Sequence, residues 1–154
     1  IHSLTGTAND QSYYESTGRP RSLNRKKWDL AELNANLKDK TSRHSRIMEA
    51  YLKMLRRRNN HPAFDPEAHM HVHDCGPAFF VISRHAIDGS ETVDCLFNLT
   101  PREQELPEPA EPSPPLFQTE TYYDILSARN MNLSKKKIHL QPYQALWLTP
   151  KHKR

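Results

Sequence analysis

Two short segments near the N-terminus carry residue types that bind hydroxyl groups and oxyanions. The first is Gly6-Thr7-Ala8-Asn9-Asp10, where an amide and a carboxyl group offer donors and acceptors. The second, Gly18–Arg25, holds three closely spaced arginines, and guanidinium groups bind phosphate or carboxylate through paired hydrogen bonds. The same composition also fits a polar surface loop held by local Asx turns, so the residues alone leave both interpretations open.

Arg58 is a third feature with possible chemistry, because it falls on the apolar face of a predicted helix. An unpaired buried charge is expensive, so its guanidinium must find acceptors. A structural ion pair and a ligand contact at the end of the helix are equally compatible with the sequence.

Three alternating histidines, His69, His71 and His73, would lie on one face of a strand. Three imidazoles can hold a zinc ion. However, successive positions on one strand face lie roughly 6.5–7 Å apart at Cα, and nothing in the sequence supplies a fourth ligand. We therefore expect an exposed polar strand face and no metal.

The usual catalytic groups are not identifiable. Cys75 precedes Gly76-Pro77, which is typical of a turn, and no flanking sequence supports a nucleophile. Glycoside chemistry needs a pair of carboxylates. The aspartates that could contribute to such a pair are Asp10, Asp29, Asp65 and Asp74. None of them ends a strongly buried strand, so the sequence identifies no catalytic pair of carboxylates.

Length and composition limit the fold. The chain has 154 residues, a net charge of +4 and 36% hydrophobic residues, with a mean hydropathy of −0.86. This allows a modest core in one domain or two small pieces. No stretch approaches 18 apolar residues and no secretory pattern is visible, so neither a membrane span nor secretion is expected. Because the first residue is Ile1 rather than Met, we expect a piece of a larger protein.

The charge is divided into blocks of +7 over residues 1–61, −9 over 62–134 and +6 over 135–154. Such a split can mark a nucleic-acid surface. Here acids are mixed with the bases of the first block and no nucleic-acid motif is present, so we expect solvated surface and no nucleic-acid partner. Cys75 and Cys95 make no disulfide framework and fit reduced thiols in a cytosolic protein.

The N-terminal part is predicted to be helical after a long irregular loop over residues 1–27. Asp29, with Glu32, predicts the cap of a short helix over residues 30–38. Thr41 or Ser42 would cap a helix over 43–59. Its predicted buried stripe consists of Ile47, Tyr51, Met54 and Leu55.

After Pro62 the apolar period changes from 3.6 to about 2, which indicates strands. They are predicted over residues 69–73, 78–84, 92–99, 121–126, 137–140 and 143–148, with a hairpin turn at Asp88-Gly89. Residues 101–115 contain six prolines and should form an exposed, extended loop. The prediction is an α+β chain: helices first, then an antiparallel module of five or six strands.

The sequence resembles a known family, the sucrose phosphorylase-like enzymes of the α-amylase superfamily. Ile1-His2-Ser3-Leu4-x-Gly6-x-x-Asn9-Asp10 resembles the segment after their last barrel strand. Gly18-Arg19-x-Arg21-Ser22-Leu23-Asn24-Arg25 is similar to their Gly-Arg-x-Ile-Asn-Arg stretch. Arg58-Asn59-x-His61-Pro62-Ala63-Phe64 and Leu140-x-Pro142-Tyr143-x-x-x-Trp147-Leu148 resemble two later signatures. The four motifs stand in the family's order and together extend over nearly the whole chain.

The resemblance implies that residues 1–64 are the end of a (β/α)8 catalytic barrel, a loop plus helices. Residues 65–150 would be a sandwich-like antiparallel C-terminal domain with the Pro-rich loop at 101–115, and residues 151–154 a basic tail. The family's nucleophile and acid/base lie on earlier strands. This chain alone would therefore be inactive and would require the missing barrel portion of the same enzyme.

The resemblance also assigns substrate-binding residues. Asn9 and Asp10 match the Asn-Asp of the mobile loop beside the acceptor site, and Arg58 matches the arginine that helps to hold the terminal glucosyl unit. No catalytic residue and no metal ligand is carried over. Leu23 replaces the family's usual Ile, and the loop over residues 11–16 differs from plain sucrose phosphorylases. Glucosylglycerate and sucrose 6′-phosphate phosphorylases are therefore also compatible relatives.

The resulting prediction is the C-terminal part of a cytoplasmic, retaining glycosidic phosphorylase. It would move a glucosyl group from sucrose or a related α-glucoside to inorganic phosphate, with no cofactor and no membrane partner. A hydrolase or transglucosidase of the same superfamily is the first alternative. The second is a stand-alone module that binds carbohydrate or a polyanion.

Overall fold

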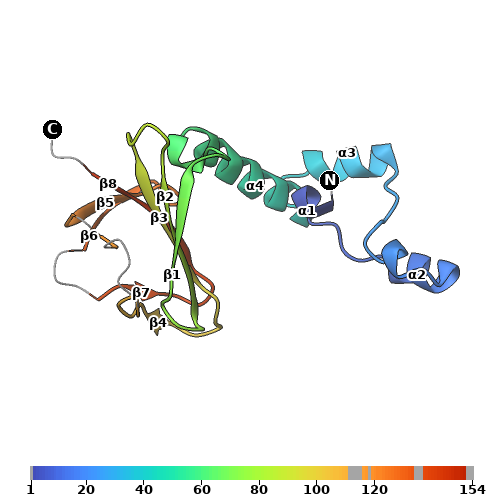
Figure 1. Ribbon diagram of the computed structural model, residues 1–154. Helices are drawn as coiled ribbons and strands as arrows, with labels where there is room; N and C mark the ends of the chain where they lie inside the picture. The colour runs from blue at the N-terminus through green and yellow to red at the C-terminus, as the bar shows by residue number, and fades with distance from the viewer. Residues whose placement is uncertain (1, 111–115, 118, 134–136, 152–154) are drawn as a thin grey trace. The chain divides into compact units, whose positions relative to one another are not determined.

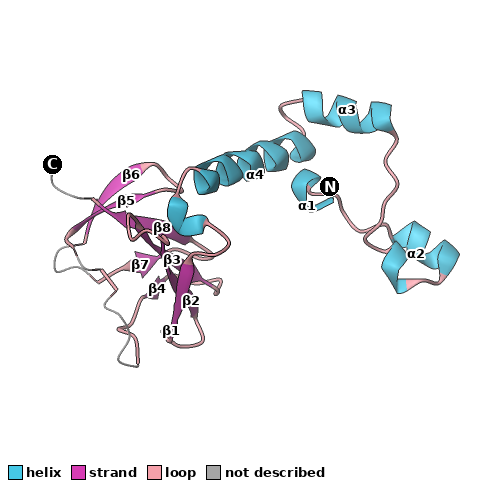
Figure 2. Ribbon diagram, turned by 45° about the horizontal axis from the view of Figure 1, so that its top comes forward, coloured by secondary structure: helices cyan, strands magenta, loops and turns pink. Residues whose placement is uncertain are grey.

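The computed structural model describes residues 2–110, 116–117, 119–133 and 137–151. Over these residues the chain is α+β, with the helices first and the antiparallel strands after them, which confirms the predicted order (Figures 1 and 2). It divides into two compact units, Ile1–Arg56 and Arg57–Arg154. The expectations for Ile1, for residues 111–115 of the Pro-rich loop and for residues 152–154 of the basic tail lie outside the described residues.

The first unit contains α1 (His2–Thr5), α2 (Gln11–Thr17), the 3-10 helix η1 (Pro20–Ser22), α3 (Leu30–Lys38) and the first part of α4 (Arg43–Asn59). The expectation of a wholly irregular loop over residues 1–27 is therefore wrong. α2 forms because Asp10 caps it, its Oδ1 accepting a hydrogen bond from the Tyr13 N–H at 2.9 Å. Gly18, in the left-handed region at φ 62°, ends the helix.

The two longer helices begin and end at the predicted residues. Asp29 caps α3 by accepting the Glu32 N–H at 2.9 Å. Ser42, rather than Thr41, caps α4, because its Oγ accepts the Ser45 N–H at 3.0 Å.

The predicted apolar stripe of α4 is not a buried face in this chain. Ser45 is its only fully buried residue within the described chain, and Tyr51 is 38% exposed. Leu33 is the only fully buried apolar side chain among the described residues of the first unit. The expected burial of the stripe is wrong here, because the unit presents too little apolar surface to cover it.

Polar contacts hold the first unit together instead. His44 Nδ1 lies 2.7 Å from the Thr5 carbonyl oxygen, and Trp28 Nε1 donates to Thr7 Oγ1 at 2.9 Å. The Asp10 N–H donates to the Leu23 carbonyl at 2.6 Å. These bonds join segments that are 13 to 39 residues apart in the chain.

The second unit is built on a six-stranded antiparallel sheet with the order β1-β2-β3-β8-β5-β6, and β4 and β7 form a separate pair (Figure 1). The strands are β1 (His69–His73), β2 (Phe79–His85), β3 (Thr92–Asn98), β4 (Gln104–Glu105), β5 (Thr121–Asp124), β6 (Arg129–Asn132), β7 (His139–Leu140) and β8 (Ala145–Pro150). β4 and β6 were not predicted. The Pro-rich region is not wholly exposed, since Leu106 packs against the core.

Both faces of the central sheet carry buried side chains. One face carries the core, which includes Val81, Leu96, Leu146 and Leu148. The other face meets the 3-10 helix η2 (Pro62–Phe64), whose Phe64 ring lies 4.7 Å from that of Trp147. Because η2 follows directly on α4, this packing fixes the chain segment that contains Arg58 and His61.

Candidate functional site

Asp10 and Asn9 lie at the start of α2. The Asp10 carboxylate accepts hydrogen bonds through Oδ1 from the Tyr13 N–H at 2.9 Å and the Ser12 hydroxyl at 2.8 Å. These two bonds lower the pKa of Asp10 and keep the group ionised. Within the described residues, no partner is recorded for the second oxygen, Oδ2, or for the exposed amide of Asn9. These groups are free to accept or donate to a ligand.

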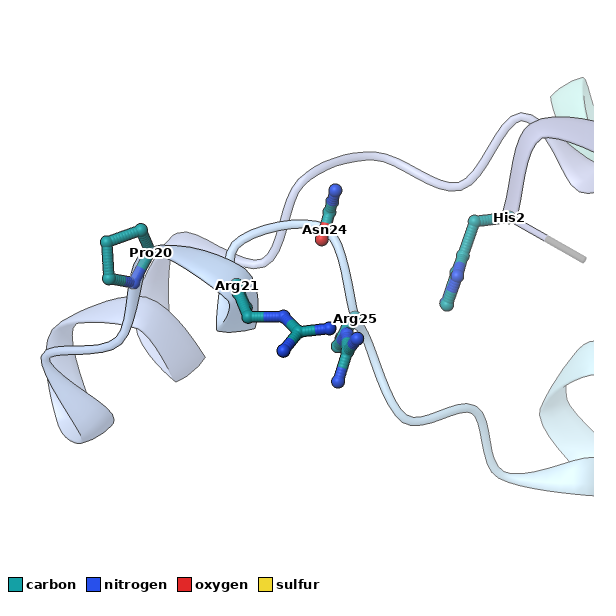
Figure 3. Close-up of a pocket in the computed structure, with 5 residues that line it drawn as sticks. All are labelled: His2, Pro20, Arg21, Asn24 and Arg25. Atoms are coloured by element: carbon teal, nitrogen blue, oxygen red, sulfur yellow. The ribbon is translucent and has the colours of Figure 1, made fainter.

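The two N-terminal segments singled out in the sequence lie together. The bond from the Asp10 N–H to the Leu23 carbonyl joins them directly. Asn9 lines one shallow hollow with Gly6, Thr7, Asn24 and others, and a second hollow with Asp10, Trp28 and His44. A third hollow is lined by His2, Pro20, Arg21, Asn24 and Arg25 (Figure 3).

Arg58 belongs to the second unit and lines a separate hollow at the end of α4. Its Nη2 donates to the Phe64 carbonyl at 3.0 Å, and its guanidinium carbon lies 5.7 Å from the centre of the Phe64 ring. No ion pair of Arg58 is recorded within the described residues, so a structural salt bridge does not explain its half-buried position. The hollow is lined by Arg58, Asn59, Asn60, His61, Pro62, Phe64, Asp65 and Pro66.

Glu91, in the turn between β2 and β3, makes hydrogen bonds that fix the chain segment around this hollow. One carboxylate oxygen lies 2.6 Å from His61 Nδ1, and the other accepts the Ala63 N–H at 3.3 Å. Arg84 adds two more bonds, from Nε to the Ala63 carbonyl and from Nη2 to the Asp65 carbonyl. The backbone that supplies the acceptor of Arg58 is therefore fixed from two neighbouring positions.

The sequence did not identify Glu91 or Arg84 as parts of this site. Glu91 lies 30 residues from His61 and Arg84 lies 21 residues from Ala63, and no local pattern links them. Only the covering of the sheet by η2 brings these residues together.

The alternating histidines differ from expectation. β1 forms as predicted, but His73 is buried, and its Nε2 lies 2.8 Å from the Ser83 hydroxyl. The expectation of an exposed polar face is wrong at this position, since the core of the second unit covers His73. In the part of the chain that the structure describes, no group of histidines, cysteines and acids could hold a metal ion.

The two thiols are buried and free of disulfides. Burial, assisted by the neighbouring Asp74, raises the pKa of Cys75, and burial raises the pKa of Cys95 to about 12. Protonated, buried thiols are poor nucleophiles, which fits the sequence argument against a catalytic cysteine.

Comparison with known proteins finds relatives of one kind, each named glucosylglycerate phosphorylase. The protein from Spirochaeta thermophila is 34% identical over 155 residues, covering 97% of this chain and 26% of its own length. The protein from Allomeiothermus silvanus is 40% identical over 104 residues, covering 68% of this chain and 18% of its own. The protein from Escherichia coli is 23% identical over 96% of this chain and 24% of its own. This chain thus spans about a quarter or less of the length of these relatives.

No family model matches the chain. Among solved structures, a crystal structure from Bacteroides fragilis, described as that of an alpha-galactosidase candidate, covers 51% of this chain and 17% of its own. It is 17% identical, with a TM-score of 0.36. Within the described residues, no helix is long and apolar enough to cross a membrane.

Proposed function

We propose that this chain is the C-terminal part of a phosphorylase that transfers a glucosyl group from glucosylglycerate to inorganic phosphate. The observation that carries the proposal is the similarity to the Spirochaeta thermophila protein over 97% of the chain. Sucrose, the donor first suggested by the sequence, has no support from these relatives, and we propose glucosylglycerate in its place.

The missing part of the enzyme would supply the chemistry of bond cleavage. In the family that the sequence resembles, an aspartate takes the glucosyl group while a glutamic acid protonates the leaving oxygen. Phosphate then attacks the glucosyl-enzyme, which gives glucose 1-phosphate and restores the carboxylate. No pair of carboxylates in this chain is proposed for these roles, so the isolated chain should be inactive.

Arg58 is proposed to contact the glucosyl unit. A guanidinium has five N–H donors, and in Arg58 one nitrogen bonds the Phe64 carbonyl. The remaining donors suit sugar hydroxyls, whose oxygens accept hydrogen bonds. The bonds that Glu91 makes to His61 and Ala63 support this role, because they hold the hollow in one shape before the sugar binds.

Asn9 and Asp10 are proposed to lie beside the acceptor. The ionised Asp10 carboxylate can accept bonds from glycerate hydroxyls, and the Asn9 amide can donate to or accept from them. Residues 1–64 would then be the end of the catalytic barrel and residues 65–150 the C-terminal β domain. The remaining barrel is the partner that this assignment requires.

The test is a chimera in which this chain replaces the matching quarter of the Spirochaeta thermophila protein. We expect phosphate-dependent release of glucose 1-phosphate from glucosylglycerate. The parent enzyme is the positive control, and the parent lacking that quarter is the negative control. A chimera that melts cooperatively and elutes as the parent does, yet releases only free glucose, would instead favour a hydrolase. A folded chimera with no activity would contradict the proposal.

A further inference from the structure

The described residues that line the hollow shown in Figure 3 are cationic or neutral. Its residues are His2, Pro20, Arg21, Asn24 and Arg25, and the Arg21 side chain extends from η1 towards Arg25. The adjoining hollow shares His2 and Asn24 with it and adds Asn9 and Arg43, again without an acidic residue. Guanidinium groups that line one hollow repel each other, and an anion between them would relieve that repulsion.

Neither Arg21 nor Arg25 has a side-chain partner among the described residues for which a bond is recorded. The acids of the first unit are all used elsewhere. Asp10, Asp29 and Asp39 accept backbone N–H groups at turns or helix starts. Glu32 pairs with Lys26, Glu49 pairs with Lys40, and Glu15 accepts a bond from Gln11. Among the described residues of the first unit, no acid therefore serves as a counter-ion to this pair of arginines.

The backbone beneath the two arginines is well fixed. Pro20 sets the first position of η1, and the buried Ser22 accepts a bond from the Thr17 hydroxyl at 2.7 Å. The Arg25 N–H donates to the Ser22 carbonyl at 3.2 Å. The loop that carries the two side chains is thus ordered before a ligand binds, so binding does not include the entropy cost of ordering its backbone.

His2 is also oriented. Its Nε2 lies 2.8 Å from the Lys26 carbonyl oxygen, and since a carbonyl can only accept, Nε2 carries the hydrogen. The ring is therefore held in one orientation at the rim of the hollow.

From these observations we propose that Arg21 and Arg25, with Asn24 and His2, form a subsite for a small oxyanion, a carboxylate or a phosphate. Planar guanidinium groups bond two oxygens of such an anion at once. The anion has two sources in the reaction, the carboxylate of glucosylglycerate and inorganic phosphate. This last link rests on the proposed function, whereas anion binding by the chain does not.

Binding is tested on the 154-residue chain by following the arginine Nε–Hε signals in NMR spectra during separate titrations with inorganic phosphate and D-glycerate at constant ionic strength. We expect the Arg21 and Arg25 signals to move with a millimolar Kd, and Arg21→Gln or Arg25→Gln to weaken binding by about tenfold. Arg19→Gln is the matched control, because Arg19 is exposed in the same loop but does not line the hollow.

Two outcomes would overturn the subsite. One is the absence of any shift at about 50 mM of either anion, which is above the Kd range expected for such contacts. The other is an equal loss of binding in Arg19→Gln, which would show a diffuse charge effect.

The source of the anion is tested in the chimera. An Arg21→Gln variant that raises the KM for glucosylglycerate, with the KM for phosphate unchanged, assigns the carboxylate; the reverse assigns phosphate. If the chain binds anions but neither KM changes, the subsite lies outside the reaction and that link is wrong. An inactive chimera whose chain still binds anions contradicts the proposed function and leaves the subsite standing.

Discussion

Ser83 donates its hydroxyl hydrogen to Oδ1 of Asp94 at 2.6 Å. The Ser83 hydroxyl oxygen itself lies 2.8 Å from Nε2 of His73, so three adjacent strands are joined by one buried polar chain. Because the only hydroxyl hydrogen goes to Asp94, Nε2 must donate, and the hydrogen of the neutral imidazole sits there. Nδ1 of His73 is buried and has no hydrogen-bond partner among the described residues.

This arrangement predicts that acid destabilises the second unit through His73. Burial, then the charges of His71 and His85, lower the pKa of His73 below its usual 6.5. As the pH falls through about 6.5, His73 therefore binds a proton in the unfolded chain but not yet in the folded chain. This contribution to stability is complete above that pH and decreases as the pH falls below it, by at most about 1.4 kcal/mol per pH unit. Chemical denaturation at pH 7.5 and at pH 5.5 measures the difference.

The matched variants are His73→Gln and His69→Gln. His69 lies on the same strand but is exposed, so its replacement is the control for the measured pH dependence. His73→Gln should reduce it, whatever its effect on the stability at pH 7.5. An unchanged pH dependence in His73→Gln would show that the proton is taken up elsewhere.

The titration of Asp94 changes the stability of the folded chain with pH in the opposite direction to that of His73. Burial raises its pKa above the usual 3.8, so this group favours the folded chain at low pH, and that contribution is lost as the pH rises through its titration. The Asp94→Asn variant removes the contribution of Asp94 to the pH dependence of stability. The contribution of His73 can then be measured by itself.

The second prediction concerns the thiols. Because burial raises the pKa of both Cys75 and Cys95, neither is a thiolate at pH 8, and both should resist thiol reagents in the folded chain. In an Ellman assay we expect almost no reaction under native conditions and two thiols per chain after addition of guanidinium chloride. A fast native reaction of one thiol would mean that its part of the core opens readily.

The third prediction is that Gly6→Ala destabilises the first unit more than Gly18→Ala does. Both glycines lie in the left-handed region, at φ 60° and 62°, so each change costs about 1–2 kcal/mol through the backbone. At Gly6 the added Cβ would also overlap Cδ1 of Ile47, whereas nothing lies within 4 Å at Gly18. Denaturation followed by circular dichroism at 222 nm measures both, and equal losses would contradict the role of Ile47.

Local signals explain what the sequence predicted well. α3 and α4 have side-chain caps at Asp29 and Ser42 and clear apolar periodicity, and their bounds were predicted correctly. α2 was missed because it has no apolar stripe and depends on the cap at Asp10. β6 was missed because Arg129-Asn130-Met131-Asn132 contains few strand-forming residues and is held by pairing with β5.

The candidate site likewise contains residues that local sequence patterns indicate and residues that only tertiary packing brings in. Arg58 and Asp10 were predicted from motifs in contiguous sequence. Glu91 was not, because its partner His61 is distant in the chain and meets it only through the packing of η2 on the sheet. The burial of His73 was missed for a related reason: a strand pattern shows which residues share a face, but not which face the core covers.

The last prediction concerns Arg58 in the chimera with the Spirochaeta thermophila protein. Arg58→Ala should lower kcat/KM by about two orders of magnitude or more, because it removes donors proposed to hold the glucosyl unit. It should change the melting temperature little, since within the described residues one hydrogen bond, to the Phe64 carbonyl, is recorded for the side chain. Arg58→Lys keeps the charge but loses the planar fork, so an intermediate activity is expected.

Glu91→Gln serves as the structural counterpart, because Glu91 touches His61 and Ala63 and is not proposed to touch the sugar. It should lower the melting temperature more than Arg58→Ala does and lower kcat/KM less. If Arg58→Ala is folded and keeps the kinetics of the unsubstituted chimera, Arg58 does not bind the substrate. Its contact with Phe64 then only ends the helix, and the hollow has to be assigned another role.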